Sequence, residues 1–312
     1  MSKLQLPIVV TPTRVELANR CHRRHFLSDI LGKARYFSPS LEFGTVMHSA
    51  FAAHWMNQKA ANPTDPFAVI DTEWAKRKVE SDDLTPQLAK SMLSDYMAKA
   101  QIAGPFTAQG NFKLVDVEQR FELPIRDSRL SFQMDRIVHD PEQNWMVIVD
   151  SKTAGRLDSR WDRQWETSIQ MKLYRAGAMQ VFQTGGRVDI VVEGVLKHAP
   201  SDVRYYVCPE WSETLLKEAI HQAYMVASLD RDLVEQASDM VNLADSQGQI
   251  QQTLLPNAEK ALALGVSMTP INYMDCYSYG VECPFRRICV ADVEQRVDIM
   301  KAEFFDIQDE GY

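Results

Sequence analysis

The chain has 312 residues, of which 45% are hydrophobic and 24% are charged, a balance that suits one large globular domain or a domain with an insertion. The formal net charge of −8 argues against a broad nucleic-acid-binding surface, although Lys and Arg are concentrated in residues 1–36 and 152–175. No apolar run approaches the roughly 20 residues that a membrane helix needs, and the start of the chain has no small-residue cleavage site. We therefore expect a cytoplasmic protein without a membrane partner, whose five cysteines are reduced or metal-bound.

The first third of the chain carries helical patterns separated by polar breaks. Thr11 is a suitable N-cap for a helix that brings Cys21 near its end. In a second helix, His48 shares a face with apolar side chains at helical spacing, and a histidine in that setting is more often a packed core residue than a ligand. We expect residues 56–110 to form a helical insertion over the core. Helices are predicted over residues 11–27, 44–55 and 69–102, with breaks at 28–43, 61–68 and 82–86.

Segments rich in large and β-branched residues predict strands in the middle of the chain. Helical segments flank these strands on both sides, and this order predicts an α/β fold with a mixed central sheet. The predicted strands cover residues 113–123, 132–138, 145–149, 185–198 and 202–208, and further helices are predicted over residues 159–182 and 211–265.

Residues 131–152 form a predicted β-hairpin, in which HDPEQN supplies the turn. If the turn centres on its Glu-Gln pair, Asp135 lies opposite Asp150, and Lys152 lies opposite Gln133. Directly opposed residues have Cβ atoms roughly 4.5–5.5 Å apart. Lys152 projects from the same face as Asp150, because side chains alternate along a strand. Two carboxylates and one amine therefore converge at one end of the hairpin.

This convergence suits a divalent cation. Two close carboxylates repel each other unless a cation lies between them, and Mg²⁺ or Mn²⁺ prefers oxygen ligands. Such an ion lowers the pKa of a bound water, and the Lys152 ammonium can orient that water or offset charge on a phosphate. The alternative interpretation is a surface hairpin whose acids and lysine form solvated ion pairs.

The order of these residues resembles the PD-(D/E)XK nuclease superfamily. The resemblance rests on Asp135 followed by Asp150–Lys152. QMKLY, residues 170–174, resembles the Gln-x-x-x-Tyr motif of the RecB-like branch, and GTVMH, residues 44–48, resembles its Gly-x-x-x-His motif. Departures are Phe132 where the family usually has Gly, no Pro before Asp135, and His22 in place of a common Pro.

The resemblance implies a restriction-endonuclease-like fold, a metal-dependent nuclease activity and a set of site residues. Gln170 and Tyr174 are implied to lie beside the site and help to hold a DNA strand. Glu118, on the preceding predicted strand, is either another acid near the metal or an exposed strand residue. The implied metal ligands are His48, Asp135, Asp150 and the backbone carbonyl of Ser151, with Lys152 assisting the water.

Four cysteines also resemble the family in their order. Cys276, Cys283 and Cys289 are closely spaced and Cys21 is distant, a set that suits tetrahedral zinc or an iron–sulfur cluster. Spacing does not separate these two possibilities, but the resemblance favours a 4Fe–4S cluster, as in AddB-type helicase–nucleases and CRISPR-associated RecB-like exonucleases. The cluster would join segments 11–30 and 272–290 and have a structural role.

The remaining cysteine and two histidines have simpler interpretations. Cys208 falls in an apolar predicted strand, where a buried free thiol is expected. A local zinc site made of Cys21, His22 and His25 is a weak alternative, because no fourth ligand is evident.

We therefore predict a single nuclease domain over residues 1–312 that hydrolyses DNA, as an exonuclease acting on single strands or duplex ends. DNA repair or recombination is the expected setting, with a helicase or recombinase as a partner; the sequence does not show an oligomeric state. One alternative is a non-catalytic iron–sulfur module that binds DNA or assembles with such a partner. Another is a zinc-stabilised regulatory protein.

Overall fold

In this computed structural model, the described residues are 9–30, 33–34, 38–77, 79, 81–183, 185–245, 283, 285–291, 295–296, 298–299 and 305–306. The chain divides into two compact units. Unit 1 comprises Met1–Tyr36, Pro124–Leu130 and His221–Tyr312, and unit 2 comprises Phe37–Leu123 and Ser131–Ile220. The expectations of a single domain over residues 1–312 and of an insertion at 56–110 stay predictions.

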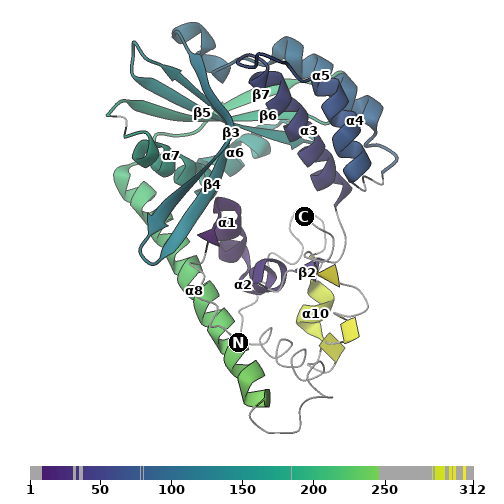
Figure 1. Cartoon of the computed structure of the whole chain (residues 1–312), viewed down its shortest axis with the longest axis vertical. Coiled ribbons are helices and arrows are strands. Elements are labelled where there is room, and N and C mark those ends of the chain that lie inside the picture. Colours follow the sequence, from purple (N-terminus) through teal and green to yellow (C-terminus); the bar gives the residue numbers. More distant parts are fainter. Residues whose placement is uncertain are drawn as a thin grey trace. The chain divides into compact units, whose positions relative to one another are not determined.

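A mixed sheet with the strand order β1-β4-β5-β6-β7, in which β3 also pairs with β4, confirms the predicted mixed α/β architecture (Figure 1). Neighbours β1–β4 and β5–β6 are parallel, whereas β4–β5 and β6–β7 are antiparallel. The strands are β1 (Val9–Val10), β3 (Lys113–Ile125), β4 (Ser128–Asp140), β5 (Trp145–Ala154), β6 (Arg187–Leu196) and β7 (Val203–Val207); β2 (Lys33–Ala34) and β8 (Phe305–Asp306) form a separate pair.

The register of the β4–β5 hairpin agrees with the sequence prediction. Paired residues run from Asp140 and Trp145 at the turn to Arg136 and Val149, so the turn centres on the Glu-Gln pair. The ladder ends there, one position before the two aspartates, and the expected pair of Gln133 and Lys152 lies beyond it. The hairpin therefore aligns the aspartates without a backbone ladder between them.

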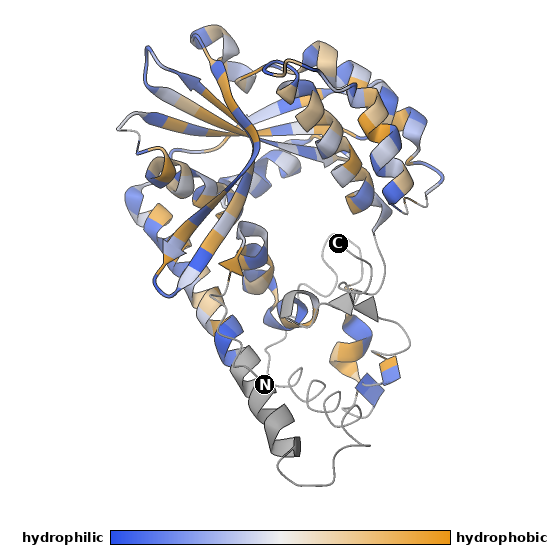
Figure 2. Ribbon diagram, viewed as in Figure 1, coloured by the Kyte–Doolittle hydropathy of each residue, from blue (hydrophilic) through white to orange (hydrophobic). Residues whose placement is uncertain are grey.

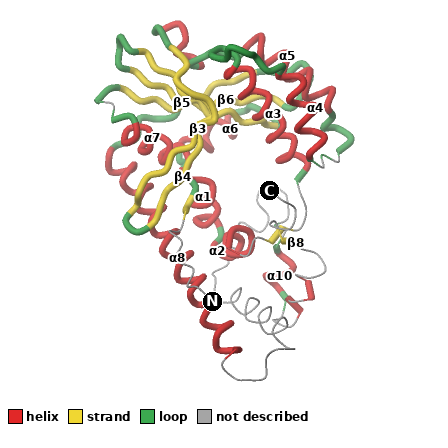
Figure 3. Tube along the Cα trace, in the orientation of Figure 1, coloured by secondary structure: helices red, strands yellow, loops and turns green. Residues whose placement is uncertain are grey.

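In unit 2, helices lie on both faces of the sheet (Figures 1 and 3). Helices α3 to α5 pack on one face and α6 and α7 on the other, as the neighbours of β6 show: Val195 belongs to the core of α3–α5, whereas a Cβ at Gly194 would lie 2.5 Å from Trp161 of α6. These helices are α3 (Pro39–Met56), α4 (Pro66–Lys76), α5 (Pro86–Lys99), α6 (Ser159–Glu166) and α7 (Ile169–Val181), with a 3-10 turn at Gly104–Gln109.

Two helix predictions in unit 2 were wrong in their boundaries. The helix predicted to begin at residue 44 begins at Pro39, inside the stretch expected to be irregular; a Pro in the first turn is typical of helix starts. The helix predicted over residues 159–182 is two helices, because the Ser168 side chain accepts a hydrogen bond from the Met171 N–H and begins α7.

Unit 1 contains α1 (Pro12–Arg20), α2 (His22–His25), a π-helical turn (Phe26–Ile30), α10 (Arg286–Val290) and most of α8 (Glu213–Asp245). The helix predicted over residues 11–27 is interrupted, because Cys21 has extended backbone angles of φ −156° and ψ 108°. Asp230 of α8 lies 2.5 Å from Nε2 of His25 and 3.2 Å from Nη2 of Arg14. The part of the predicted helix 211–265 after Asp245 lies outside the described residues.

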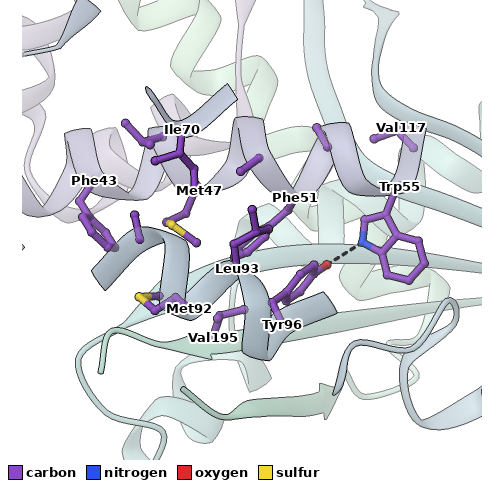
Figure 4. Close-up of a cluster of buried hydrophobic side chains, with 14 residues drawn as sticks. Phe43, Met47, Phe51, Trp55, Ile70, Met92, Leu93, Tyr96, Val117 and Val195 are labelled. Atoms are coloured by element: carbon purple, nitrogen blue, oxygen red, sulfur yellow. Dashed lines mark hydrogen bonds between the residues drawn. The ribbon is translucent and has the colours of Figure 1, made fainter. Parts of the chain in front are cut away.

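The core next to the candidate site lies between α3, α4, α5 and the sheet (Figure 4). Hydrophobic positions run along the strands and along these helices (Figure 2). Phe51 stacks on Tyr96, with ring centroids 4.0 Å apart, and Trp55 Nε1 donates a hydrogen bond to the Tyr96 hydroxyl at 2.6 Å. Buried residues of this cluster include Phe43, Met47, Phe51, Trp55, Ile70, Met92, Leu93, Tyr96 and Val195.

Candidate active site

The hairpin of β4 and β5 brings the predicted aspartates and lysine to one place. Asp135 and Asp150 lie one position beyond the last pair of the ladder. The backbone N–H of Ser151 donates a hydrogen bond to Oδ2 of Asp135 at 2.8 Å, in place of a ladder bond. Lys152 Nζ lies 2.8 Å from Oδ2 of Asp150. The ladder between β4 and β5 therefore ends at a charged cluster, although both strands continue beyond it.

His48 reaches this cluster from α3. Its Nδ1 lies 3.3 Å from Oδ2 of Asp135. The helix can come close to β5 because residue 44 is a glycine, whose added Cβ would lie 3.3 Å from the Thr153 hydroxyl. The structure thus places His48 at the cluster, and not solely in the apolar core that its helix face suggested.

Glu118 of β3 completes the group. One ligand atom each from His48, Glu118 and Asp135 lie within 4.8 Å of one another, close enough together to hold one metal ion. Gln133 Nε2 donates a hydrogen bond to Oε2 of Glu118 and holds the carboxylate in place. The sequence left Glu118 undecided between a metal-site acid and an exposed strand residue; the structure puts it beside Asp135.

The backbone at Glu118 is unusual, because its φ is 55° within a strand. Residues other than glycine rarely adopt this left-handed region, and such strain is concentrated at functional sites. A residue in this conformation disturbs the regular alternation of the strand, as bulges next to active sites do. We infer that the local conformation directs the Glu118 carboxylate toward Asp135.

Burial, aided by the charge of Asp135, raises the pKa values of two of the acids in the cluster. Burial raises the pKa of Glu118 to about 7, and the negative charge of Asp135 adds to this shift. Burial raises the pKa of Asp150 to about 6, although the Lys152 ammonium opposes the change. Burial also acts on Asp135, but His48 and then Lys152 hold its pKa below the ordinary value. For His48, burial lowers the pKa, and the Asp135 carboxylate more than offsets it, so the pKa is raised.

These features fit a divalent cation. Asp150 is 1% exposed; Lys152 pairs with its Oδ2, whereas its Oδ1 has no hydrogen-bond partner among the described residues. This carboxylate and two further acids offer the oxygen donors that a hard divalent ion prefers, and the imidazole of His48 adds a nitrogen donor. Asp150 lies outside the group of three ligand atoms within 4.8 Å, where its nearest charge is Lys152. A small open pocket adjoins the group and is lined by His48, Glu118, Asp135, Ser151, Arg136 and Trp55 among others.

Gln170 and Tyr174 lie together on α7. The Gln170 side-chain amide donates a hydrogen bond to the Tyr174 hydroxyl at 2.9 Å. Burial raises the pKa of Tyr174 well above its usual value, and the charges of Asp150 and Asp135 add to the shift. The Tyr174 ring centroid lies 6.2 Å from that of Phe132 on β4, the strand that also carries Asp135.

The predicted cluster-binding cysteines fall partly outside the described residues, since Cys276 is among the undescribed ones. Cys21 is 7% exposed and lies at the break between α1 and α2. Cys289 belongs to α10, and its backbone carbonyl lies 3.5 Å from Nη1 of Arg23, so α2 and α10 meet within unit 1. Cys283 precedes α10. Within the described part of the chain, these cysteines do not form a group of metal ligands.

Two smaller predictions about unit 1 and β7 can be compared directly. The local zinc site of Cys21, His22 and His25 is not formed among the described residues, where buried His25 binds Asp230 instead. Cys208 is a buried free thiol, as expected, although it follows the end of β7 and does not lie inside the strand.

A mixed sheet with helices on both faces, and an acidic group next to a histidine where the β4–β5 ladder ends, define an α/β protein with a candidate metal site. A family model described as "PD-(D/E)XK nuclease superfamily" matches residues 9–290 of the chain. The chain therefore belongs to the PD-(D/E)XK nuclease superfamily. No helix in the described residues has the length and hydropathy of a membrane span.

Solved structures with similarity to the chain include a protein from Eubacterium rectale named "Putative exonuclease". It has a TM-score of 0.46 and 15% identity, over 71% of this chain and 82% of that one. A protein named SSO0001 has a TM-score of 0.31 and 11% identity, over 72% of this chain and 79% of that one. A search of curated proteins gives no significant match.

Proposed function

We propose that this protein is a Mg²⁺- or Mn²⁺-dependent DNA nuclease of the RecB-like branch. The observation that supports it most strongly is the convergence of His48, Glu118 and Asp135 within 4.8 Å, beside the Asp150–Lys152 pair. A solvated surface hairpin, the alternative from the sequence, would leave Asp150 exposed, whereas it is 1% exposed. An acidic cluster of this kind is costly unless a cation neutralises it.

The metal would be held by His48, Asp135, Asp150 and the backbone carbonyl of Ser151, with Glu118 as a further acid. When bound, it would lower the pKa of a coordinated water and polarise a phosphoryl oxygen. The Lys152 ammonium, next to Asp150, would orient that water or offset the charge that builds on the phosphate. The water would lose a proton and bond to phosphorus through its oxygen, while the scissile P–O bond would break and the leaving oxygen would take up a proton from solvent.

Gln170 and Tyr174 would hold the DNA strand at the edge of this site. Their hydrogen bond orients the phenol, and burial keeps it protonated and able to donate to a phosphate. We propose exonuclease activity on single strands or duplex ends, in the cytoplasm, in DNA repair or recombination with a helicase or recombinase partner.

Cleavage of end-labelled single-stranded oligonucleotides with Mn²⁺ or Mg²⁺ tests the activity. Lys152→Ala should lower the cleavage rate by about 10² to 10³, because a charge that stabilises the transition state is lost. Lys217→Ala is the matched control: this lysine is 72% exposed and pairs with Glu213 one helical turn away. DNA binding without metal-dependent cleavage by the wild type would favour the non-catalytic binding module instead.

We further propose that Cys21, Cys276, Cys283 and Cys289 hold a 4Fe–4S cluster, with Zn²⁺ as the alternative occupant. The contact between Arg23 and Cys289 supports this, because it brings the segments that carry the first and last cysteines together within unit 1. Iron analysis and visible absorption of anaerobically purified protein test it. Cys21→Ser should lose the iron, while Cys208→Ser, an equally buried thiol outside the set, should retain it. Zinc without iron would support the zinc-stabilised protein.

A further inference from the structure

A fully buried ion pair lies next to the candidate metal ligands, both in the sequence and in space. Arg136, next to Asp135 on β4, is 1% exposed, and Glu193 of β6 is 0% exposed. Nη2 of Arg136 lies 2.9 Å from Oε1 of Glu193. Replacing a buried ion pair with apolar residues is often neutral or stabilising, so stability alone does not account for this pair.

Glu193 contacts side chains from several elements, among them Arg136 of β4, Tyr96 of α5 and Ser151 of β5. Its Oε2 accepts hydrogen bonds from the Tyr96 hydroxyl at 2.8 Å and from the Ser151 hydroxyl at 2.8 Å. Nη1 of Arg136 also lies 3.4 Å from this oxygen. Glu193 is paired in register with Ser151 on the neighbouring parallel strand, which sets the distance between them. The carboxylate therefore connects β4, β5 and α5.

Arg136 is fixed just as completely. Its Nε donates to the backbone carbonyl of Ile102 at 3.0 Å, and Nη2 donates to that of Gln101 at 3.2 Å. Its guanidinium lies 4.1 Å from the centroid of the Trp55 ring, and Trp55 in turn donates to Tyr96 (Figure 4). Trp55 belongs to α3, the helix that carries His48. The network thus contacts every element that supplies a proposed metal ligand except β3.

Ser151 is the point at which this network meets the candidate metal site. Its N–H donates to Asp135, and its hydroxyl donates to Glu193, both at 2.8 Å. The neighbouring residues in sequence are Asp150 and Lys152, whose side chains alternate with that of Ser151 along the strand. A shift of Ser151 would therefore move the carboxylate before it, the amine after it and its own carbonyl.

We propose that Glu193, with Arg136 and Tyr96, is a positioning residue that holds Ser151 so that its backbone carbonyl can bind the metal ion. This proposal rests on the proposed metal-dependent function. It adds a role for α5 within the segment 56–110, because the Tyr96 hydroxyl supports the metal site without belonging to it. Partners that orient metal ligands are worth about 10- to 100-fold in metal affinity.

Mn²⁺ binding, measured by titration calorimetry, tests the positioning role independently of turnover. Ser151→Ala removes the hydroxyl and retains both the backbone carbonyl and the N–H to Asp135. It should weaken Mn²⁺ binding about 10- to 100-fold. Tyr96→Phe removes a second hydroxyl of the network without changing a candidate metal ligand. This variant should also bind Mn²⁺ more weakly than the wild type.

Ser201→Ala is the matched control. Ser201 is 1% exposed, and its hydroxyl donates to the backbone carbonyl of Leu196 at 2.8 Å, so the variant loses an equally buried hydrogen bond elsewhere in unit 2. If Ser151 were merely structural, Ser151→Ala and Ser201→Ala would lower the melting temperature alike and both would bind Mn²⁺ as the wild type does.

The outcomes separate this proposal from the function on which it rests. Wild-type protein that binds no Mn²⁺ would overturn the metal site and the positioning role with it. Wild-type protein that binds Mn²⁺, together with Ser151→Ala and Tyr96→Phe variants of unchanged affinity, would overturn the positioning role alone. Weakened binding in both variants, with Ser201→Ala unaffected, is the result we expect.

Discussion

At the scale of single residues, Glu118 carries two costs at once. Its φ of 55° places a side chain in the left-handed region, which costs about 1–2 kcal/mol, and burial beside Asp135 raises its pKa to about 7. Neither cost helps the fold. Both are understandable if the carboxylate is held ready for a cation, since functional sites retain strain that the rest of the structure supports.

Glu118→Gly should therefore stabilise the protein in the absence of metal, and it should lower the metal-dependent cleavage activity. Glycine adopts a positive φ without a steric penalty, and the substitution removes a desolvated acid next to Asp135. After the entropy cost of glycine, we expect a gain of about 1 kcal/mol in the free energy of unfolding, measured by denaturant titration in EDTA. Glu122→Gly on the same strand is the control and should destabilise, because Glu122 has no positive φ to relieve. A destabilised Glu118→Gly variant would contradict the account.

The raised pKa values also predict how stability depends on pH in the absence of metal. In the folded protein the pKa of Glu118 is about 7 and that of Asp150 is about 6, both above the ordinary carboxyl value. The stability that these two protonated groups contribute is therefore fully present below the ordinary carboxyl pKa, and it is lost as the pH rises through the folded pKa values. The metal-free wild type should lose stability between about pH 4.5 and 7. The advantage of Glu118→Gln over the wild type should grow across this range, as denaturant titrations at several pH values would show. An advantage that is constant with pH would argue against crowded carboxylates.

The sequence could predict those parts of the site whose residues lie close together along the chain. The positions of Asp135, Asp150 and Lys152 could be predicted because a hairpin turn fixes the register of its two strands. The proximity of Glu118 could not, because it depends on one residue's backbone angle and on a pairing between β3 and β4. The role of Glu193 was equally hidden, since it needs a parallel neighbour that is distant in sequence.

At the scale of elements, Phe132 shows how the chain accommodates a departure from its family. The Phe132 side chain packs against α7 where residue 177 is glycine, and a Cβ there would lie 2.3 Å from the phenyl ring. The ring centroid of Phe132 is also 6.2 Å from that of Tyr174. The bulky residue on β4 and the glycine on α7 therefore form a matched pair that sets the height of α7 above the sheet.

Gly177→Ala should destabilise the protein by about 1–3 kcal/mol, although alanine is the better helix former, because the added methyl overpacks the contact with Phe132. In a Phe132→Ala background the same substitution should cost much less, which a double-mutant cycle of unfolding free energies would measure. Gly155→Ala, where an added Cβ meets nothing within 4 Å, is the control and should be nearly neutral. Equal costs of Gly177→Ala in both backgrounds would rule out the matched pair.

The strands were predicted more accurately than the helix boundaries, for a physical reason. Strand segments were identified by β-branched runs that the sheet confirms. The breaks at Cys21 and before Ser168 depend on capping and on extended backbone at single residues, which helical periodicity does not report. The start of α3 at Pro39 had a local signal, a proline in the first turn, that periodicity outweighed.

At the scale of the whole molecule, the order of the motifs along the chain indicated the nuclease family more clearly than any single motif did. Family membership covers residues 9–290, and the candidate site lies wholly within unit 2, so the nuclease chemistry can be tested separately from the cysteines of unit 1. The network of Glu193 links helices α3 and α5 to β4 and β5, the strands that carry Asp135 and Asp150. The fold thus supports a small acidic site with elements that are far apart in sequence.

The most direct test of the central claim is a calorimetric titration of Mn²⁺ into the wild type and into Asp135→Asn, with Asp202→Asn as the exposed control. The side chain of Asp202 is 72% exposed and belongs to no ligand group in the described residues. We predict saturable binding to the wild type and to Asp202→Asn, and a loss of that binding in Asp135→Asn. Equal binding by all three proteins, or none by the wild type, would contradict a metal site at the end of the hairpin.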